Sequence, residues 1–204
     1  MNPDLLRNLL EALAGGTVTV ADAIERLRHL PFSDVEGARL DHHRELRTGM
    51  PEVVFGEGKT AEQIVTIARE FVARSGAVLI TRIDAAKAAE LVAAIDGIEH
   101  HADARIAMRR NNGAAQAARS GHVAVISAGT SDQPVAEEAA RTLEFLGIEV
   151  RRYRDLGISG LHRLLAEREK LLDASVVIVV AGMEGALPSV VGGLLDVPII
   201  AVPT

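Results

Sequence analysis

The sequence predicts an α/β fold, with a doubly wound parallel sheet in the C-terminal part preceded by a smaller helical and α/β region. Apolar runs at 122–127, 175–180 and 198–202 have the length of buried strands. The run 175–180 (SVVIVV) is apolar after its first residue, as is typical of a parallel strand covered on both faces. Loops of small residues and amphipathic helical patterns alternate with these strands, which favours right-handed crossovers. We therefore expect an N-terminal region, 1–118, and a C-terminal domain, 119–204.

The stretch 121–147 shows the repeating strand–loop–helix unit most clearly. Its strand ends at small polar residues, and a helix is expected to open at Ser131 or Asp132, with Pro134 in the first turn. Gly147 supplies the helix stop. The same order continues with a strand at 148–152, a loop at 154–160, a helix from Leu161, the strand at 175–180, a helix from Pro188 and the last strand at 198–202.

The N-terminal region is predicted to begin with two short amphipathic helices. The first covers 4–14, and the second is opened by Thr19 with Asp22 and ended by Pro31. Segment 32–51 is polar, and we expect it to be solvated and salt-bridged. Further on, the pattern predicts a strand at 52–55, a helix at 61–74, a strand at 77–81, a helix at 85–94, a strand around 106–108 after the polar break at 100–103, and a connection at 111–120.

Composition excludes several classes of function. The chain has 22 Lys and Arg against 28 Asp and Glu, a net charge of −6, and no basic block, which argues against nucleic-acid partners. Aromatic residues make up only 2%, so platforms for stacking bases are scarce. No cysteine is present, which excludes disulfides and a cysteine nucleophile within these residues. Apolar runs are too short to span a membrane and no signal peptide is evident, so we expect a cytoplasmic protein.

Two loops are the expected walls of a ligand site, because doubly wound sheets bind ligands at the carboxyl ends of their strands. These loops are 127–132 and 181–186. The helix start after the first loop suits a phosphate or carboxylate. Asp132 at that start either caps the helix or holds a ribose hydroxyl or a metal. Glu184 follows an apolar strand, and it either acts as a general acid/base in an apolar setting or points to water.

Polar residues of the N-terminal region give weaker signals. Lys59 lies in the glycine loop 56–60, which imitates the end of a phosphate-binding P-loop, but Val53 stands where that motif requires glycine. The loop is therefore either an anion contact or an ordinary turn. The adjacent His42 and His43 do not share one side of a regular element, so a metal pair there is weakly indicated.

Four motifs together resemble the LarB family of nickel-pincer cofactor biosynthesis proteins. They are LDHHRELRTGMPEVVFGEGKT at 40–60, VISAGTSDQPVAEEA at 125–139, RDLGISGLHRLL at 154–165 and VVAGMEGALPSVVGGLLDVPIIAVPT at 179–204. The C-terminal half is similar to the PurE (phosphoribosylaminoimidazole carboxylase) fold, which is flavodoxin-like. This resemblance implies carboxylation of nicotinic acid adenine dinucleotide at C5 of its pyridinium ring, with hydrolysis of the phosphoanhydride. The implied products are pyridinium-3,5-biscarboxylic acid mononucleotide and AMP.

The resemblance also implies site residues and partners. Asp132 and Glu184 are the expected acid/base or metal-holding carboxylates. The carboxyl donor is CO2 or bicarbonate, no cofactor is predicted, with Mg2+ left open, and PurE-like proteins assemble as homo-octamers. The expected substrate-binding residues are Arg47, Lys59, Ser127, Gly129, Thr130, Ser131, Asp155, Gly182, Met183, Gly185 and Ala186.

Two departures from the family patterns keep other functions open. PurE carries a histidine before the Leu-Pro of its third loop, where this chain has Ala186, which disfavours an aminoimidazole ribonucleotide carboxylase/mutase. In the LarB family a cysteine nucleophile follows the last strand, whereas this sequence reaches Thr204 without one. We expect truncation at that point, leaving residues 1–204 without the covalent step. The remaining alternative is a non-catalytic nucleotide-binding module whose N-terminal helices dock a partner.

Overall fold

The computed structural model describes residues 3–27, 32–35, 38–111 and 121–204. The chain divides into two compact units. The N-terminal unit comprises residues 1–100 and 107–115, and the C-terminal unit comprises residues 101–106 and 116–204.

The C-terminal unit is built on a four-stranded sheet in which every pair of neighbours is parallel. The strand order is β10-β9-β7-β8, so in chain order the second strand lies outside the first, and the third and fourth lie on its other side. This is the doubly wound, flavodoxin-like order, and it confirms the predicted fold class. The strands are β7 His122–Ser127, β8 Glu149–Tyr153, β9 Val176–Ala181 and β10 Ile199–Pro203.

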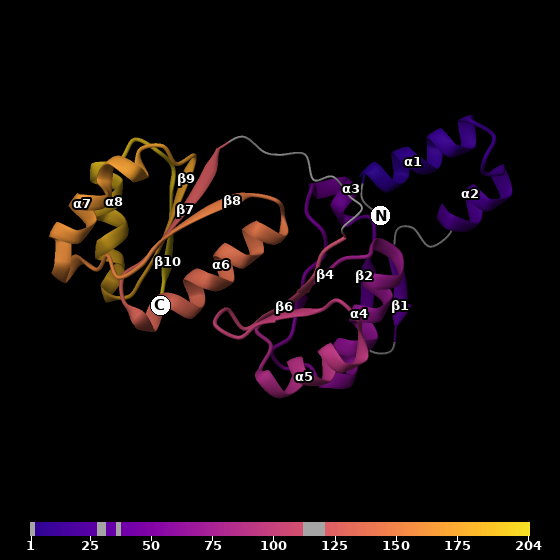
Figure 1. The fold of residues 1–204 in the computed structure, drawn as a ribbon, viewed down its shortest axis with the longest axis horizontal. Coiled ribbons are helices and arrows are strands. Elements are labelled where there is room, and N and C mark those ends of the chain that lie inside the picture. Colours follow the sequence, from indigo (N-terminus) through magenta and orange to yellow (C-terminus); the bar gives the residue numbers. More distant parts are fainter. Residues whose placement is uncertain (1–2, 28–31, 36–37, 112–120) are drawn as a thin grey trace. The chain divides into compact units, whose positions relative to one another are not determined.

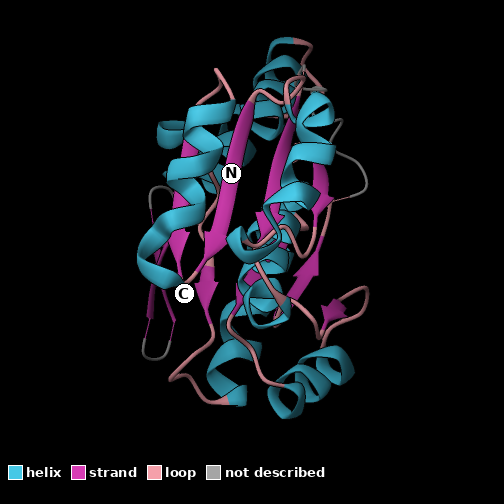
Figure 2. Cartoon of the chain, turned by 90° about the vertical axis from the view of Figure 1, so that its left-hand side faces the viewer, coloured by secondary structure: helices cyan, strands magenta, loops and turns pink. Residues whose placement is uncertain are grey.

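Each strand-to-helix connection of this sheet passes through a short 3-10 turn. The turns are η1 Thr130–Asp132, η2 Ile158–Gly160 and η3 Met183–Gly185, and they lead into the helices α6 Gln133–Phe145, α7 Leu161–Leu171 and α8 Ala186–Leu194. Helices α7 and α8 cover one face of the sheet and α6 covers the other (Figure 1). Seen from the side of α7 and α8, these helices lie in front of the strands (Figure 2).

Strand β7 is buried at every position, and its side chains alternate between the two faces. Ala124 and Ile126 belong to the core under α7 and α8, whereas Val123 and Val125 belong to the core under α6. The side chain of Ser127 therefore follows Val125 toward the α6 face. This alternation decides which face of the sheet each side chain at the end of β7 meets.

The N-terminal unit contains a second four-stranded sheet, of order β3-β4-β6-β5, and a separate two-stranded hairpin. In the larger sheet β3 and β4 are parallel, and β4 and β6 are antiparallel. Its core is formed by apolar side chains of the strands with those of α4 and α5. The elements are α1 Pro3–Ala14, α2 Val20–Leu27, β1 Phe32–Val35, β2 Ala38–Asp41, α3 Arg44–Thr48, β3 Val54–Phe55, α4 Ala61–Ser75, β4 Val78–Thr81, α5 Ala85–Ala94, β5 Glu99–His101 and β6 Ile106–Arg109.

Most predicted helix and strand starts are confirmed. The Thr19 hydroxyl and the Asp22 backbone N–H make the expected contact before α2, at 3.1 Å. Helix α5 occupies residues 85–94 as predicted. The predicted helix stop at Pro31 and the connection after Asn111 lie outside the described residues.

The polar segment 32–51 was expected to be solvated and salt-bridged, and no helix or strand was predicted in it. It forms the antiparallel hairpin of β1 and β2 and the short helix α3. An expected salt bridge is present, because Arg47 Nη2 lies 2.7 Å from Asp41 Oδ2. Leu40 is nonetheless buried in the core of the unit, which gives the hairpin an apolar anchor despite its polar composition. The polar residues at 100–103 likewise do not prevent β5 from forming.

In the part of the chain that the structure describes, no helix is long and apolar enough to cross a lipid bilayer.

Candidate functional site

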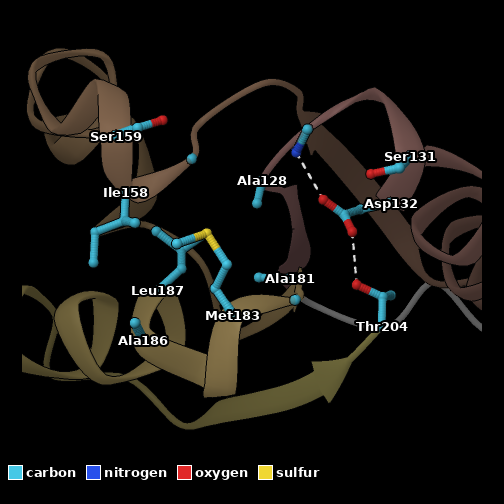
Figure 3. A pocket seen from close by; sticks show the side chains of 13 residues that line it. Ala128, Ser131, Asp132, Ile158, Ser159, Ala181, Met183, Ala186, Leu187 and Thr204 are labelled. Atoms are coloured by element: carbon cyan, nitrogen blue, oxygen red, sulfur yellow. Dashed lines mark hydrogen bonds between the residues drawn. The ribbon is translucent and has the colours of Figure 1, made fainter.

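A cavity of about 520 Å³ lies at the carboxyl ends of β7, β8 and β9, where the sheet order reverses. All of its lining residues belong to the C-terminal unit. The loop after β7 and the loop after β8 form opposite sides, and the turn after β9 closes the base (Figure 3). The lining residues are Ala128, Gly129, Ser131, Asp132, Gly157, Ile158, Ser159, Ala181, Gly182, Met183, Ala186, Leu187 and Thr204.

Three helix starts contribute to this lining, because each loop leads directly into α6, α7 or α8. The first backbone N–H groups of a helix have no partner within the helix, and they carry partial positive charge. An anionic group near one such start gains about 0.3–1 kcal/mol, and more when it is partly buried. The cavity is therefore suited to a phosphate or carboxylate bound by backbone groups.

The loops after β7 and β8 approach each other closely at Gly157. A Cβ atom on this residue would lie 2.9 Å from the carbonyl oxygen of Ala128, closer than real side chains come. The Leu156 N–H donates to the carbonyl oxygen of Ser127 at 3.1 Å and joins the same two loops. Glycine at position 157 is thus required for the observed width of the cavity.

Among the described residues that line the cavity, Asp132 is the one with a charged side chain. Asp132 is 7% exposed. Its Oδ2 accepts a hydrogen bond from the Gly129 N–H at 2.8 Å, and its Oδ1 accepts one from the Thr204 hydroxyl at 2.6 Å (Figure 3). The Asp132 side chain makes no capping hydrogen bond to α6, so the predicted role as a helix cap is not found. Asp132 instead ties the turn after β7 to the residue following β10.

The turn after β9 has three consecutive residues in the left-handed region: Met183, Glu184 and Gly185, with φ of 51°, 56° and 75°. Glu184 is exposed and does not line the cavity, so the alternative in which it points to water describes its position. The side chain of Met183 lines the cavity beside Leu187 (Figure 3). Gly182 and Ala186 line it as expected, whereas Gly185 does not.

Three other predicted substrate-binding residues lie outside the lining. Ser127 is 1% exposed and faces α6. Thr130 is exposed in the turn before α6. Asp155 forms an ion pair with Arg163 at the start of the loop after β8. The structure brings Gly129, Ser131 and Asp132 together with the residues after β9.

Arg47 and Lys59 belong to the N-terminal unit. Arg47 is paired with Asp41, and the hydrogen bond from this guanidinium holds the pKa of the Asp41 carboxyl below its usual range, against a smaller opposing effect of burial. Lys59 follows the turn of Gly56, whose carbonyl accepts the Lys59 N–H at 3.3 Å. The side chains of the described residues offer no group of three or more His, Asp or Glu that could hold a metal.

The loop after β8 supplies lining residues that the sequence did not indicate. Gly157, Ile158 and Ser159 were identified as part of a loop, but the expected walls were the loops after the first and third strands. Because β8 pairs with β7, its loop meets the same corner of the sheet. Thr204 and Leu187 were also not predicted to line the site, because neither belongs to a loop between a strand and a helix start.

The fold and this cavity define a class: doubly wound α/β proteins with a cavity at the switch point of a parallel sheet. Comparison with known families agrees with this class. A family model for the LarB/PurE-like N-terminal domain matches residues 32–111, and one for AIR carboxylase matches residues 122–204. The uncharacterized protein MJ0165 of Methanocaldococcus jannaschii is 37% identical over 207 residues, which cover 98% of this chain and 80% of that protein.

The chain belongs to the LarB-like family, with a PurE-like C-terminal domain. This membership supports a carboxylase-related function, with enzymology of the carboxylase/mutase type.

Proposed function

We propose that the protein is a LarB-type enzyme that carboxylates the pyridinium ring of nicotinic acid adenine dinucleotide at C5 and hydrolyses its phosphoanhydride. The products would be pyridinium-3,5-biscarboxylic acid mononucleotide and AMP. The observation that carries the proposal is the cavity at the switch point of a sheet whose sequence matches the AIR carboxylase family. Within a LarB-like chain, this cavity is the natural place for a nucleotide substrate.

The chemistry of the lining supports a substrate that carries both charges. Helix starts and loop N–H groups suit its phosphate and carboxylate oxygens. The Asp132 carboxylate is the charged side chain at the wall, and it suits the positive pyridinium ring or a ribose hydroxyl better than it suits a phosphate. Small residues such as Gly129 and Gly182 let backbone atoms approach the ligand.

Calorimetric titration with nicotinic acid adenine dinucleotide tests the proposal. We expect saturable binding to the wild-type protein. Asp132→Asn keeps the shape but replaces one of the two oxygens that accept from Gly129 and Thr204 by an amide donor, and we expect about tenfold weaker binding. Asp173→Asn, an exposed carboxylate after α7, serves as the matched control. Absence of dinucleotide binding to the wild-type protein would remove the proposal.

Product formation is checked separately, by mass spectrometry after incubation with the dinucleotide and 13C-labelled bicarbonate. The resemblance to the LarB family implies a cysteine nucleophile, and residues 1–204 contain no cysteine. We therefore expect residues 1–204 to bind the dinucleotide without turning it over. Formation of the labelled biscarboxylated mononucleotide by residues 1–204 would show that the cysteine is not needed.

A second candidate is an aminoimidazole ribonucleotide carboxylase/mutase, favoured by the AIR carboxylase match over residues 122–204. Ala186, which lines the cavity, stands where PurE carries its histidine. Titration with aminoimidazole ribonucleotide distinguishes the candidates, since binding of this ligand without binding of the dinucleotide would favour the second.

A further inference from the structure

A connected cluster of charged residues joins α6 to β8 and lies outside the cavity lining. Glu137 is its centre: Arg152 Nε donates to both carboxylate oxygens of Glu137, at 2.9 and 3.1 Å. Arg154 Nη2 donates to Oε1 of the same carboxylate at 2.7 Å. Arg152 Nη1 also donates to Glu144 at 2.6 Å, and Arg141 donates to Glu144 at 3.2 Å. The cluster thus consists of three guanidinium groups around two carboxylates.

Glu137 is 5% exposed although it lies early in α6. A buried carboxylate is unfavourable unless charge-assisted hydrogen bonds replace its hydration. The hydrogen bond to Glu144 is the largest effect that raises the pKa of Arg152, and the hydrogen bond to Glu137 raises it further. Burial of the guanidinium group opposes both. The pKa of Glu144 is lowered: burial acts against this, and the hydrogen bond from Arg152 together with the nearby guanidinium charges outweighs it. Both carboxylates are therefore paired with guanidinium groups, while Arg152 Nη2 and Arg141 Nε are buried without a hydrogen-bond partner among the described residues.

The two ends of this cluster connect to two walls of the cavity. Glu137 belongs to the helix that begins directly after Asp132 and the turn of Gly129. Arg154 directly precedes Asp155, which has a left-handed φ of 59° and opens the loop that supplies Gly157 to Ser159. One buried carboxylate thus holds both the helix after the first wall and the strand end before the second.

We propose that Glu137 is a positioning residue, which sets the spacing between the loops after β7 and β8 through Arg152 and Arg154. None of these three residues lines the cavity, so their effect on a ligand would pass through the walls. The inference rests on the proposed function only for the choice of ligand. The spacing itself is a property of the free protein.

Hydrogen exchange in the free protein tests the spacing directly. The amides to follow are Gly129, which donates to Asp132, and Leu156, which donates to Ser127. In Glu137→Gln and in Arg154→Gln we expect these amides to exchange about tenfold faster, while amides of β9 keep their relative protection. Glu149→Gln is the matched control, because Glu149 is on β8, pairs with Arg151 and is exposed.

Arg154 has a side chain that is 55% exposed, so Arg154→Gln remains testable if Glu137→Gln fails to fold. A merely structural role predicts faster exchange throughout the C-terminal unit, with no preference for the two walls. That result, or unchanged exchange at Gly129 and Leu156, would overturn the inference.

Binding provides the second readout. We expect Glu137→Gln and Arg154→Gln each to weaken binding of the dinucleotide about tenfold, and the double variant to weaken it less than the product of the two. Arg154→Lys should restore part of the affinity. If the wild-type protein binds no dinucleotide, the proposed function fails, and the exchange experiment still decides the role of Glu137. If it binds and the variants bind equally well, the positioning role fails while the proposed function stands.

Discussion

At the scale of single residues, His42 shows how burial fixes the chemistry of a side chain. It is 6% exposed, and its ring meets that of Phe71 edge to face with centroids 5.9 Å apart. Burial, followed by the charge of Arg74, lowers the pKa of His42 below 6.5, although Glu70 at 3.9 Å opposes the shift. His42 is thus a neutral core histidine of the N-terminal unit.

This shift predicts a pH dependence of stability. The unfolded chain binds a proton at His42 near pH 6.5, whereas the folded chain binds it only at lower pH. The contribution of neutral His42 to the free energy of unfolding should therefore be fully present above pH 6.5. This contribution should be lost as the pH drops from 6.5 toward the lowered pKa. His42→Asn should flatten this part of the curve, measured by urea denaturation between pH 5 and 8.

An unchanged slope in His42→Asn would contradict the assignment. The lowered pKa of Asp41 acts in a different window, below 3.8, where protonation of this carboxyl would remove its pairing with Arg47.

The role of a residue could be predicted from the sequence only where the local pattern shows which way its side chain points. In β7 every side chain is buried, so no alternation of polar and apolar residues reveals which face Ser127 occupies. The resemblance implied Ser127 as a substrate-binding residue, and the structure places its side chain toward α6. Asp132 was correctly expected beside the helix start, but its bond to Thr204 joins residues 72 positions apart, which no local pattern shows.

At the scale of elements, α4 begins with a complete capping box. The Thr60 hydroxyl accepts the Gln63 N–H at 3.2 Å, and the Gln63 side chain accepts the Thr60 N–H at 3.0 Å. Thr60→Ala should lower the free energy of unfolding by about 1 kcal/mol. Thr66→Ala, at an exposed position within the same helix, should raise it by about 0.5 kcal/mol because alanine is the better helix former. Thermal and urea denaturation measure both, and equal effects would contradict the role of the cap.

Elements with a strong period could be read from the sequence, and those stabilised by distant contacts could not. Helix α5 has apolar residues at helical spacing and an N-cap, Asp84, and strand β9 is a continuous apolar run. The hairpin of β1 and β2 is polar, and it depends on the burial of Leu40 in a core assembled from α4 and β4. Such support is invisible in a local window.

At the scale of the whole molecule, the described residues form separate hydrophobic cores in the two units. Ile80 is fully buried in the N-terminal core, and Ile80→Ala should destabilise that unit by about 2–5 kcal/mol. Hydrogen exchange should then accelerate in β4 and β6, with amides of β7 and β9 unchanged. Equal acceleration in both sets of strands would show that the units unfold together.

The four strands of the C-terminal sheet could be predicted from local patterns, whereas their order followed only from the resemblance to the flavodoxin-like PurE fold. Strand–helix alternation predicts parallel pairing, but it does not say that β8 lies outside β7. That placement brings the loop after β8 into the site.

In the left-handed turn after β9, a substitution that stabilises the fold also changes the shape of the cavity. A residue other than glycine in this conformation costs about 1–2 kcal/mol, so Met183→Gly should stabilise the protein by about 1 kcal/mol in urea denaturation. The same change removes a side chain from the cavity wall, and it should alter which ligands fit. Selection for thermal resistance alone would therefore be expected to erode this wall, whereas selection for activity would retain the less stable residue.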